Sequence, residues 1–405
     1  MHAAQAVKPT SPFLFFILFL PFGAAAGFVQ VMIGFLAHRA GIGDGAIAAM
    51  VAMNTLPQAW KFFWAPVVDT VWNGRGWYVS ANLVSSAAIV AIGLVPMTQG
   101  NVGLMSAVIL IGGLSTTMVG MCTESLMARL TAPEHRGSAA GWSQAGNVGG
   151  SLIGGIALFI AERTSHAWLP AAVVGGALLA CSFALLLVEE PVDQAPRPAL
   201  GASMRELVND LRSVLGSRNG VLAVSLCLLP IGAGGAQALF SATADQWHTS
   251  ADMVSFSNGV GGGLAAIAGS LAGGWLSDRM DRRAAYASAG LVIALVAFAM
   301  AALPKTAGPY VACVLAYNAG LGLCYATFAG FVLEVIGKGA AATKYNIFAS
   351  LSNMPIYLMT RIDGEVSERH GRIAMLLVDG GSGVLGAVLL AGVVLALRTR
   401  PARAL

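Results

Sequence analysis

Long apolar segments separated by short polar connections fill almost the whole chain of 405 residues. Most of these segments reach about 20 residues, the length that an α-helix needs to cross the hydrocarbon core of a bilayer. Twelve such segments are predicted, to within a few residues: 12–38, 45–69, 77–96, 102–130, 138–162, 166–188, 219–246, 252–277, 284–303, 308–337, 345–367 and 372–397. The pattern predicts an all-α membrane protein with twelve transmembrane helices.

A longer connection, rich in Pro, Glu and Arg, separates the sixth segment from the seventh. Within it, Ser203 and Glu206 have capping-box spacing. One face of the turns that follow is apolar and carries Leu207, Val208, Leu211, Val214 and Leu215. We expect a short amphipathic helix on the membrane surface here. The chain then divides into an N-terminal six-helix bundle (1–188), a cytoplasmic linker (189–218) and a C-terminal six-helix bundle (219–405).

Landmarks of the first half return in the second half about 210 residues later. The pairs are Pro21-Phe22-Gly23-Ala24 with Pro230-Ile231-Gly232-Ala233, Asp69 with Asp278, Thr117-x-x-Gly120-x-x-x-Glu124 with Thr327-x-x-Gly330-x-x-x-Glu334, and Arg136 with Lys344. Two homologous halves within a membrane are typical of secondary transporters, whose solute site lies between the halves.

Composition agrees with a membrane protein, because 57% of the residues are hydrophobic and only 10% are charged, against about a quarter in soluble domains. With both termini in the cytoplasm, sixteen of the 23 Lys and Arg residues fall on the cytoplasmic side and five on the other. This distribution accounts for the net charge of +4, so no nucleic-acid partner is expected. The apolar run after Lys8 continues to about Ala37, which favours an uncleaved first helix over a signal peptide.

Motifs of enzymes and ATP-driven pumps are missing from the sequence. It contains neither a G-x-x-x-x-G-K-[ST] phosphate loop nor a G-x-S-x-G elbow. The five cysteines are scattered in apolar runs without metal or redox spacing. We therefore expect no enzymatic activity, no cofactor and no metal.

The loop between the eighth and ninth segments reads Gly274-Trp275-Leu276-Ser277-Asp278-Arg279-Met280-Asp281-Arg282-Arg283. It resembles the G-x-L-x-D-R-x-x-R-R signature of the major facilitator superfamily, and the resemblance extends over all twelve segments. The first-half copy, from Ala65 through Asp69 to Arg75, is degenerate.

A narrower resemblance is to the AmpG-type muropeptide permeases, a branch that also includes siderophore and acetyl-CoA carriers. The residues that carry it are Lys61-Phe62-Phe63-Trp64-Ala65-Pro66-Val67-Val68-Asp69, Pro133-Glu134-His135-Arg136-Gly137, and Ala342-Thr343-Lys344-Tyr345-Asn346 through Ser352. Two departures set the chain apart from muropeptide permeases. Thr123-Glu124-Ser125 stands where they carry an aspartate-rich segment, and their extra C-terminal helix pair has no counterpart.

The resemblance implies the major facilitator fold, with two pseudo-symmetric six-helix bundles that work by alternating access. It also implies proton-coupled import of a small or medium organic solute, siderophore-like, peptide-like or anionic, across the bacterial inner membrane. A monomer in the lipid bilayer suffices for this fold. Two alternatives stay open: a proton-driven exporter of amphipathic compounds, and a non-transporting receptor built on a carrier fold.

Candidate solute-binding residues are polar or aromatic positions within the predicted spans. Lys61 lies about 12 Å inside the second span and has the neutral Ser270 as its counterpart, so it can meet an anionic solute or form a structural ion pair. Arg361 can bind a carboxylate-bearing solute or pair with Asp379. The full set is Gln30, Asn54, Gln58, Lys61, Trp142, Gln144, Asn147, Gln237, Tyr317, Asn318, Tyr325, Asn353, Tyr357 and Arg361.

Charged groups inside the spans are candidates for proton coupling, because a lone charge in hydrocarbon is costly. These candidates are Lys61, Glu124, Glu334 and Asp363. A structural alternative pairs Glu124 with Arg129 or Arg136, and Glu334 with Lys344 or Lys338.

Charges at the predicted cytoplasmic helix ends are candidates for a gate, since exposed ion pairs are weak enough to break in each cycle. The candidate gate residues are Asp69, Arg75, Arg136, Asp278, Arg279, Arg282, Arg283 and Lys344. The alternative is the ordinary excess of positive charge in cytoplasmic loops. Gly146, Gly150 and Gly154, spaced every four residues, predict a close helix contact that serves either sliding or plain packing.

Overall fold

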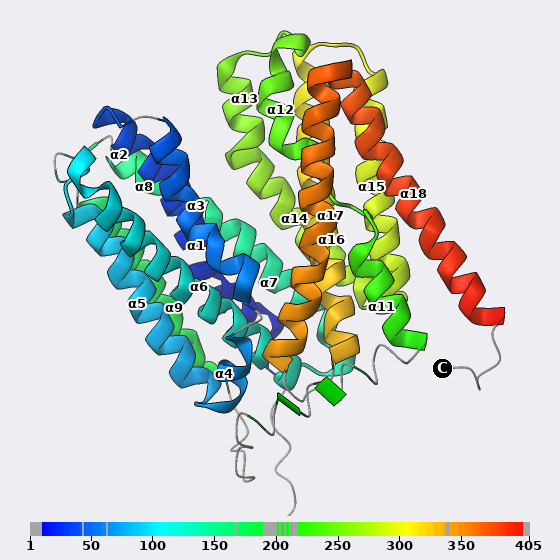
Figure 1. The fold of residues 1–405 in the computed structure, drawn as a ribbon, viewed down its shortest axis with the longest axis horizontal. Helices are drawn as coiled ribbons and strands as arrows, with labels where there is room; N and C mark the ends of the chain where they lie inside the picture. Colours follow the sequence, from blue (N-terminus) through cyan, green and yellow to red (C-terminus); the bar gives the residue numbers. More distant parts are fainter. Residues whose placement is uncertain are drawn as a thin grey trace, which may run out of the picture. The chain divides into compact units, whose positions relative to one another are not determined.

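The computed structural model describes residues 10–42, 44–61, 64–161, 168–188, 218–336 and 341–399, with a few residues of 163–166 and 201–212. All regular elements within these residues are helical (Figure 1). The predicted amphipathic helix of the 189–218 connection falls mostly outside the described residues. The division of the chain at that connection therefore stays a prediction.

The described chain forms two compact units. Unit 1 comprises Met1–Pro133, Gly146–Ser203 and Lys338–Asn346, and unit 2 comprises Glu134–Ala145, Met204–Gly337 and Ile347–Leu405. The start of the fifth predicted span thus belongs to unit 2, and the start of the eleventh belongs to unit 1.

Unit 1 is built mainly from helices of the first half of the chain. Its elements are α1 (Pro12–Phe28), a π-helical turn η1 (Val29–Ile33), α2 (Gly34–Arg39), α3 (Asp44–Trp60), α4 (Ala65–Thr70), α5 (Gly74–Leu94), η3 (Gln99–Asn101), α6 (Val102–Leu130), α8 (Ile153–Ala161), α9 (Leu169–Cys181) and η5 (Ser182–Leu187). The end of α7 (Arg136–Ser151) and the start of α17 (Ala341–His370) complete it. Helix α6 packs against α1, α3 and α5.

Glycines bring α1 very close to α7 and α8 within unit 1. A Cβ atom on Gly146 would lie 2.3 Å from the Phe16 carbonyl oxygen, and one on Gly150 would lie 2.3 Å from that of Leu20. A Cβ atom on Gly154 would lie 2.2 Å from the carbonyl oxygen of Gly27. The glycine stripe therefore packs α7 and α8 closely against α1 within one unit.

Unit 2 contains the second-half helices and the start of α7. Its elements are η4 (Pro133–His135), α11 (Arg218–Leu228), η6 (Gly235–Leu239), α12 (Phe240–Thr243), η7 (Ala244–Trp247), α13 (Ala251–Asn258), α14 (Val260–Ser277), α15 (Arg282–Ala302), α16 (Ala307–Ile336), most of α17, and α18 (Arg372–Thr399). Helix α16 packs against α14 and α15, and α15 also packs against α18.

The seventh predicted span is interrupted, so a continuous helix over 219–246 is a wrong prediction. Helix α11 ends at Leu228, and helical turns resume only at Gly235. Gly232 and Gly234 have φ of 65° and 68°, a left-handed conformation that costs little for glycine. Pro230 precedes them and has no N–H to continue the helix. The Tyr286 hydroxyl donates a 3.0 Å hydrogen bond to the Ile231 carbonyl at this break.

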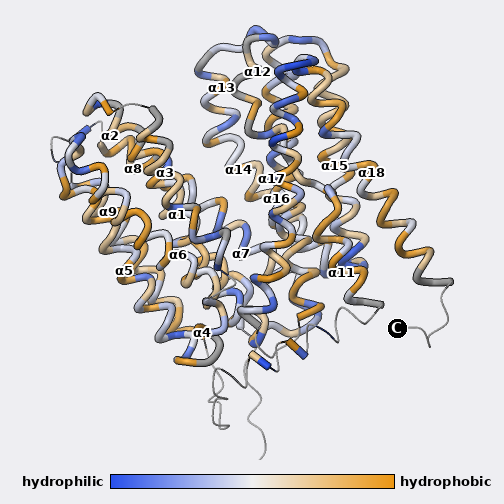
Figure 2. Tube along the Cα trace, in the orientation of Figure 1, coloured by the Kyte–Doolittle hydropathy of each residue, from blue (hydrophilic) through white to orange (hydrophobic). Residues whose placement is uncertain are grey.

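Nine helices in the described residues are long and apolar enough to cross a membrane. They are Pro12–Ala37, Gly74–Leu94, Gln99–Leu130, Pro133–Ala161, Leu169–Leu187, Asp252–Ser277, Arg282–Ala302, Ala307–Ile336 and Arg372–Ala396. Three further predicted spans correspond to α3 with α4, to the interrupted segment, and to α17, which has 30 residues. Figure 2 shows hydrophilic residues along α17, whereas α5 and α18 are largely apolar.

Local details repeat between the two halves as the sequence landmarks do. The Asn73 side chain caps α5 by accepting a hydrogen bond from the Gly76 N–H, and Asp281 caps α15 by accepting from the N–H groups of Arg283 and Ala284. The Tyr78 hydroxyl donates to the Leu18 carbonyl at 2.9 Å, much as Tyr286 bonds to Ile231. Equivalent caps and tyrosine contacts support a duplicated architecture.

Candidate functional site

A buried charged group lies inside unit 1 around Glu124, a little under two turns before the end of α6 at Leu130. Only 5% of the Glu124 surface is exposed. The Asn346 side-chain amide donates a 3.1 Å hydrogen bond to Glu124 Oε2. Lys61, which is 8% exposed, lies close enough for its ammonium charge to act on this carboxylate. The structure therefore brings together Lys61 and Glu124, two separate sequence candidates.

Local structure explains how Lys61 reaches this position. It directly follows α3, which packs along α6. Asn54, on α3, is buried, and its backbone closely approaches Gly113 of α6, because only a glycine leaves room there. Gln58 is half-buried on the same helix. The predicted pairing of Glu124 with Arg129 or Arg136 is wrong, since the groups found at Glu124 are Asn346 and Lys61.

Glu334 differs from Glu124 although the repeat makes them equivalent. Its side chain is 40% exposed and forms a 2.7 Å ion pair with Arg282. Arg282 was not among the predicted partners of Glu334, and the predicted partner Lys338 lies outside the described residues. An exposed ion pair of this kind fits a charged helix end better than a buried proton carrier.

Asp278 caps the start of α7 within unit 2. Its Oδ1 accepts a 2.7 Å hydrogen bond from the Gly137 N–H, and its Oδ2 accepts one of 2.7 Å from the Ser138 N–H. The Ser138 hydroxyl also donates to Asp278. A carboxylate at a helix N-terminus satisfies free N–H groups and interacts favourably with the helix dipole. Arg282 lies 3.9 Å from Asp278 and connects this cap to Glu334.

The other candidate gate residues differ in their exposure and in their contacts. Arg279 is exposed and stacks over the Trp275 ring at 4.2 Å, while Arg75, Arg136, Arg283 and Lys344 are half-buried. Asp69 lies in α4, and its side chain is outside what the structure describes.

A polar cluster lies in unit 2 beside the interrupted helix and is buried except for Gln237, which is exposed. The Tyr317 hydroxyl donates a 2.7 Å hydrogen bond to Asp379 Oδ2. The Gln237 amide donates a 2.7 Å hydrogen bond to Asn318 Oδ1. Asp363 is fully buried and contacts Asp379. Three of the solute candidates and one proton-coupling candidate thus lie together in this cluster.

Arg361 takes no part in this cluster. It is exposed, and its guanidinium donates a 3.3 Å hydrogen bond to the Tyr357 hydroxyl one turn earlier on α17. Its predicted pairing with Asp379 is wrong, because α17 turns Asp363 rather than Arg361 toward α18. Asn353 is exposed on the same helix.

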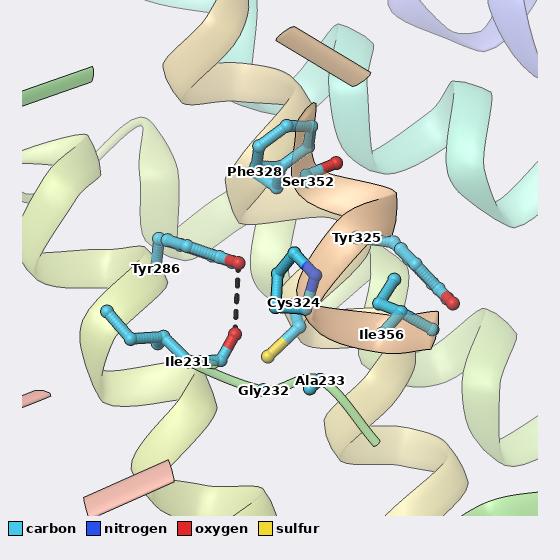
Figure 3. A pocket seen from close by; sticks show the side chains of 10 residues that line it. Ile231, Gly232, Ala233, Tyr286, Cys324, Tyr325, Phe328, Ser352 and Ile356 are labelled. Atoms are coloured by element: carbon cyan, nitrogen blue, oxygen red, sulfur yellow. Dashed lines mark hydrogen bonds between the residues drawn. The ribbon is translucent and has the colours of Figure 1, made fainter. Parts of the chain in front are cut away.

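A small cavity lies beside the break after α11 (Figure 3). Its volume is about 30 Å³, and Ile231, Gly232, Tyr286, Cys324 and Tyr325 are among the residues that line it. Sites for organic ligands are usually roughly 300–1,000 Å³. The cavity is therefore too small to hold a solute.

The remaining solute candidates are scattered over the two units. Gln30 is exposed at the π-helical turn of α1. On α7, Gln144 is buried while Trp142 and Asn147 are half-buried. No sequence pattern marks Asn346 as a functional residue, and Asp379 is predicted only as a structural partner of Arg361.

Comparison with known proteins identifies the family of this chain. The model of the Major Facilitator Superfamily matches residues 11–360. The anhydromuropeptide permease of Escherichia coli K12 is 26% identical over 355 residues, covering 82% of this chain and 69% of the permease. The same permease of Escherichia coli O157:H7 matches equally well.

Solved structures share the fold at low sequence identity. A fucose transporter of this superfamily in its outward conformation superposes with a TM-score of 0.70 at 13% identity, covering 94% of this chain and 98% of its own. The proton:xylose symporter gives 0.64 at 15% identity, with coverage of 94% of each chain. The human organic anion transporter gives 0.66 at 15% identity, with 94% and 97% covered. The family match, the repeated helices and the Asp278 loop lead to one conclusion: this chain is a multi-pass membrane transporter that belongs to the major facilitator superfamily.

Proposed function

We propose that this transporter imports a small or medium organic solute with an anionic or peptide-like part across a bacterial inner membrane, driven by protons. The similarity to an anhydromuropeptide permease over 82% of the chain supports a solute of this kind. The two six-helix bundles expose the solute site to each side of the membrane in turn. In this proposal both termini lie in the cytoplasm, as the Lys and Arg distribution predicts.

The observation that carries the proposal is the buried pair of Lys61 and Glu124. Burying both charges is costly unless each is matched by an opposite charge or a hydrogen bond. Glu124 is held by Asn346 and neutralises Lys61 when no solute is bound. An anionic group of the solute then replaces Glu124 as the partner of Lys61. A structural ion pair alone would need no such exchange of partners.

Asp278 supplies the gate in this proposal. Its hydrogen bonds to Gly137 and Ser138 hold the start of α7, and they break when the transporter changes state. Arg282 keeps Asp278 and Glu334 neutralised, so the broken contact leaves no unpaired charge in the membrane.

The test is uptake into proteoliposomes of purified protein with a panel of labelled anhydromuropeptides, siderophores, peptides and dicarboxylates. We expect at least one anionic or peptide-like compound to accumulate, faster with an inward proton gradient and not after addition of a protonophore. Lys61→Ala should abolish that uptake, while the exposed Lys305→Ala serves as the matched control. Uptake no greater than in empty liposomes for every compound would overturn the proposal, as would export with the proton gradient.

A further inference from the structure

Two buried carboxyl groups meet in unit 2, on the neighbouring helices α17 and α18. Asp363 is fully buried, and Asp379 is 5% exposed. Both carboxyl groups meet at Gly235: a Cβ atom there would lie 2.3 Å from Asp363 Oδ2, the Gly235 N–H bonds to Asp379, and the two groups are close enough to interact with each other. Two carboxylate charges at that separation repel strongly in a site without water. A positive charge or a proton must therefore accompany the pair.

The two carboxyl groups have different surroundings. Asp379 accepts hydrogen bonds from the Tyr317 hydroxyl at 2.7 Å and from the Ala236 N–H at 3.4 Å, and the Gly235 N–H also contributes. Asp363 has no hydrogen-bond donor for either oxygen among the described residues. Asp379 is thus stabilised as the anion, whereas Asp363 is satisfied only if it carries the proton itself and donates it to Asp379.

We infer that Asp363 and Asp379 together bind one proton and form the proton-carrying site of the transport cycle. The inference rests on the proposed proton coupling and assigns it to this pair. The site fits a proton better than a metal ion, since hard metal ions such as Ca²⁺ need about six or more oxygen ligands. The other groups facing Asp379 are donors, and the part of the chain that the structure describes contains no group of three or more His, Cys, Asp or Glu placed to hold a metal ion.

Other charged and titratable groups near the pair are few. Tyr317 faces it from α16, and Cys324, about two turns further along that helix, lies close enough to act on Tyr317. On α17, Arg361 is exposed and directed to Tyr357, and Glu365 pairs with Arg369 at the surface. Arg372 lies at the start of α18, about two turns before Asp379.

The pair is directly connected to the Gln237–Asn318 hydrogen bond. Gln237 follows Ala236, which donates to Asp379, and Asn318 follows Tyr317, which also donates to Asp379. A solute that displaces Gln237 from Asn318 would shift both donors of Asp379. Without those donors the Asp379 anion is less stable, so the pair holds its proton, taken from water on one side as the O–H bond of Asp363, more tightly. When the solute leaves and the donors return, the proton passes to water on the other side, and that water solvates the two carboxylates.

The first experiment needs no solute. Infrared difference spectra of the purified transporter between acid and alkaline pH should show the carbonyl stretch of a protonated carboxylic acid. Asp363→Asn removes the proton-carrying group and leaves the well-stabilised Asp379 anion, so it should lose this band, while the exposed Asp252→Asn keeps it. Asp379→Asn removes the acceptor of the Asp363 proton and should shift the band. A band that persists in Asp363→Asn, that is unchanged in Asp379→Asn, or that is removed by Na⁺ at constant pH overturns the inference. Because Asp379→Asn can fail to fold, Asp363→Glu, which keeps the carboxyl group and should shift the band, provides a second variant.

The second experiment separates this inference from the proposed function. With a transported solute, Asp363→Asn should lose stimulation by the proton gradient yet keep solute exchange across the membrane, because exchange needs no net proton movement. Gradient stimulation equal to that of Asp252→Asn overturns the inference. Absence of any transport by the unmodified protein, with the infrared band present, overturns the proposed function but not proton binding by the pair.

Discussion

The Asn346 amide and the Glu124 carboxylate are joined by a 3.1 Å hydrogen bond, although the two residues are 222 positions apart in the chain. The contact ties the start of α17 to α6 inside unit 1. Asn346 is fully buried. The carboxylate therefore has a neutral donor in Asn346 and an opposite charge in Lys61, and the two contributions can be separated by mutation.

Removal of either charge should destabilise the transporter more than removal of both. Lys61→Ala leaves the buried Glu124 carboxylate without an opposite charge, and Glu124→Gln does the same to the Lys61 ammonium. Loss of one partner of a buried ion pair typically costs about 3–5 kcal/mol. Lys61→Met/Glu124→Gln leaves neither charge and should recover much of the loss. Thermal unfolding in detergent measures this cycle. Strictly additive losses would show that the two residues do not interact.

Removal of the Asp278 cap should weaken the start of α7. Asp278→Ala leaves the N–H groups of Gly137 and Ser138 without their acceptor, which costs roughly 1 kcal/mol for a helix cap. Hydrogen exchange of residues 136–140 should accelerate. Asp252→Asn, an exposed residue on α13, is the control, and equal exchange in both variants would contradict the capping role.

A methyl group at Gly269 should disrupt the contact between α14 and α16. Its Cβ atom would lie 1.9 Å from the Ala319 carbonyl oxygen, a backbone atom that cannot move alone. Overpacking of this kind costs about 1–3 kcal/mol. Gly392→Ala is the matched control, because no atom within 4 Å opposes its Cβ atom. Equal melting temperatures for the two variants would show that the helices separate easily.

The helix interruption should be sensitive at Gly232. Its φ of 65° suits glycine, and a Cβ atom would approach Cys324 Sγ to 2.5 Å. Gly232→Ala should therefore cost at least about 1–2 kcal/mol, the usual penalty of the left-handed conformation. Gly364→Ala, in open space on α17, should be neutral or slightly stabilising. A stable Gly232→Ala protein with unchanged circular dichroism would mean that this turn adapts.

The helical architecture is predictable from sequence because span length and the repeat both leave clear one-dimensional patterns. The interruption after α11 also has a signal, since Pro230 is followed closely by Gly232 and Gly234. That signal is hard to interpret, because glycine-rich stretches also occur within intact membrane helices, where small residues allow close packing. Tertiary contacts decide between the two structures, here through Tyr286 and Ile231.

The candidate sites are harder to predict, because their members come from helices that no spacing rule relates. Lys61 and Glu124 each stand out as charges within apolar segments, but their meeting depends on how α3 packs along α6. Arg361 is exposed and Asp363 is buried, because residues two apart on a helix face different ways. Which of them faces inward depends on the rotation of α17, and the sequence contains no rule for that.

The opened backbone after α11 and the acid on α18 depend on each other. The Ala236 amide, released from a regular helical pattern, donates to Asp379, so the carboxylate gains a partner that an unbroken helix would not offer. A homologue with leucine at position 379 would lack that acceptor, and we would expect its seventh span to form one continuous helix. Substitutions at the break near Ala236 and at Asp379 should accordingly covary among homologues, although 143 positions separate the two residues.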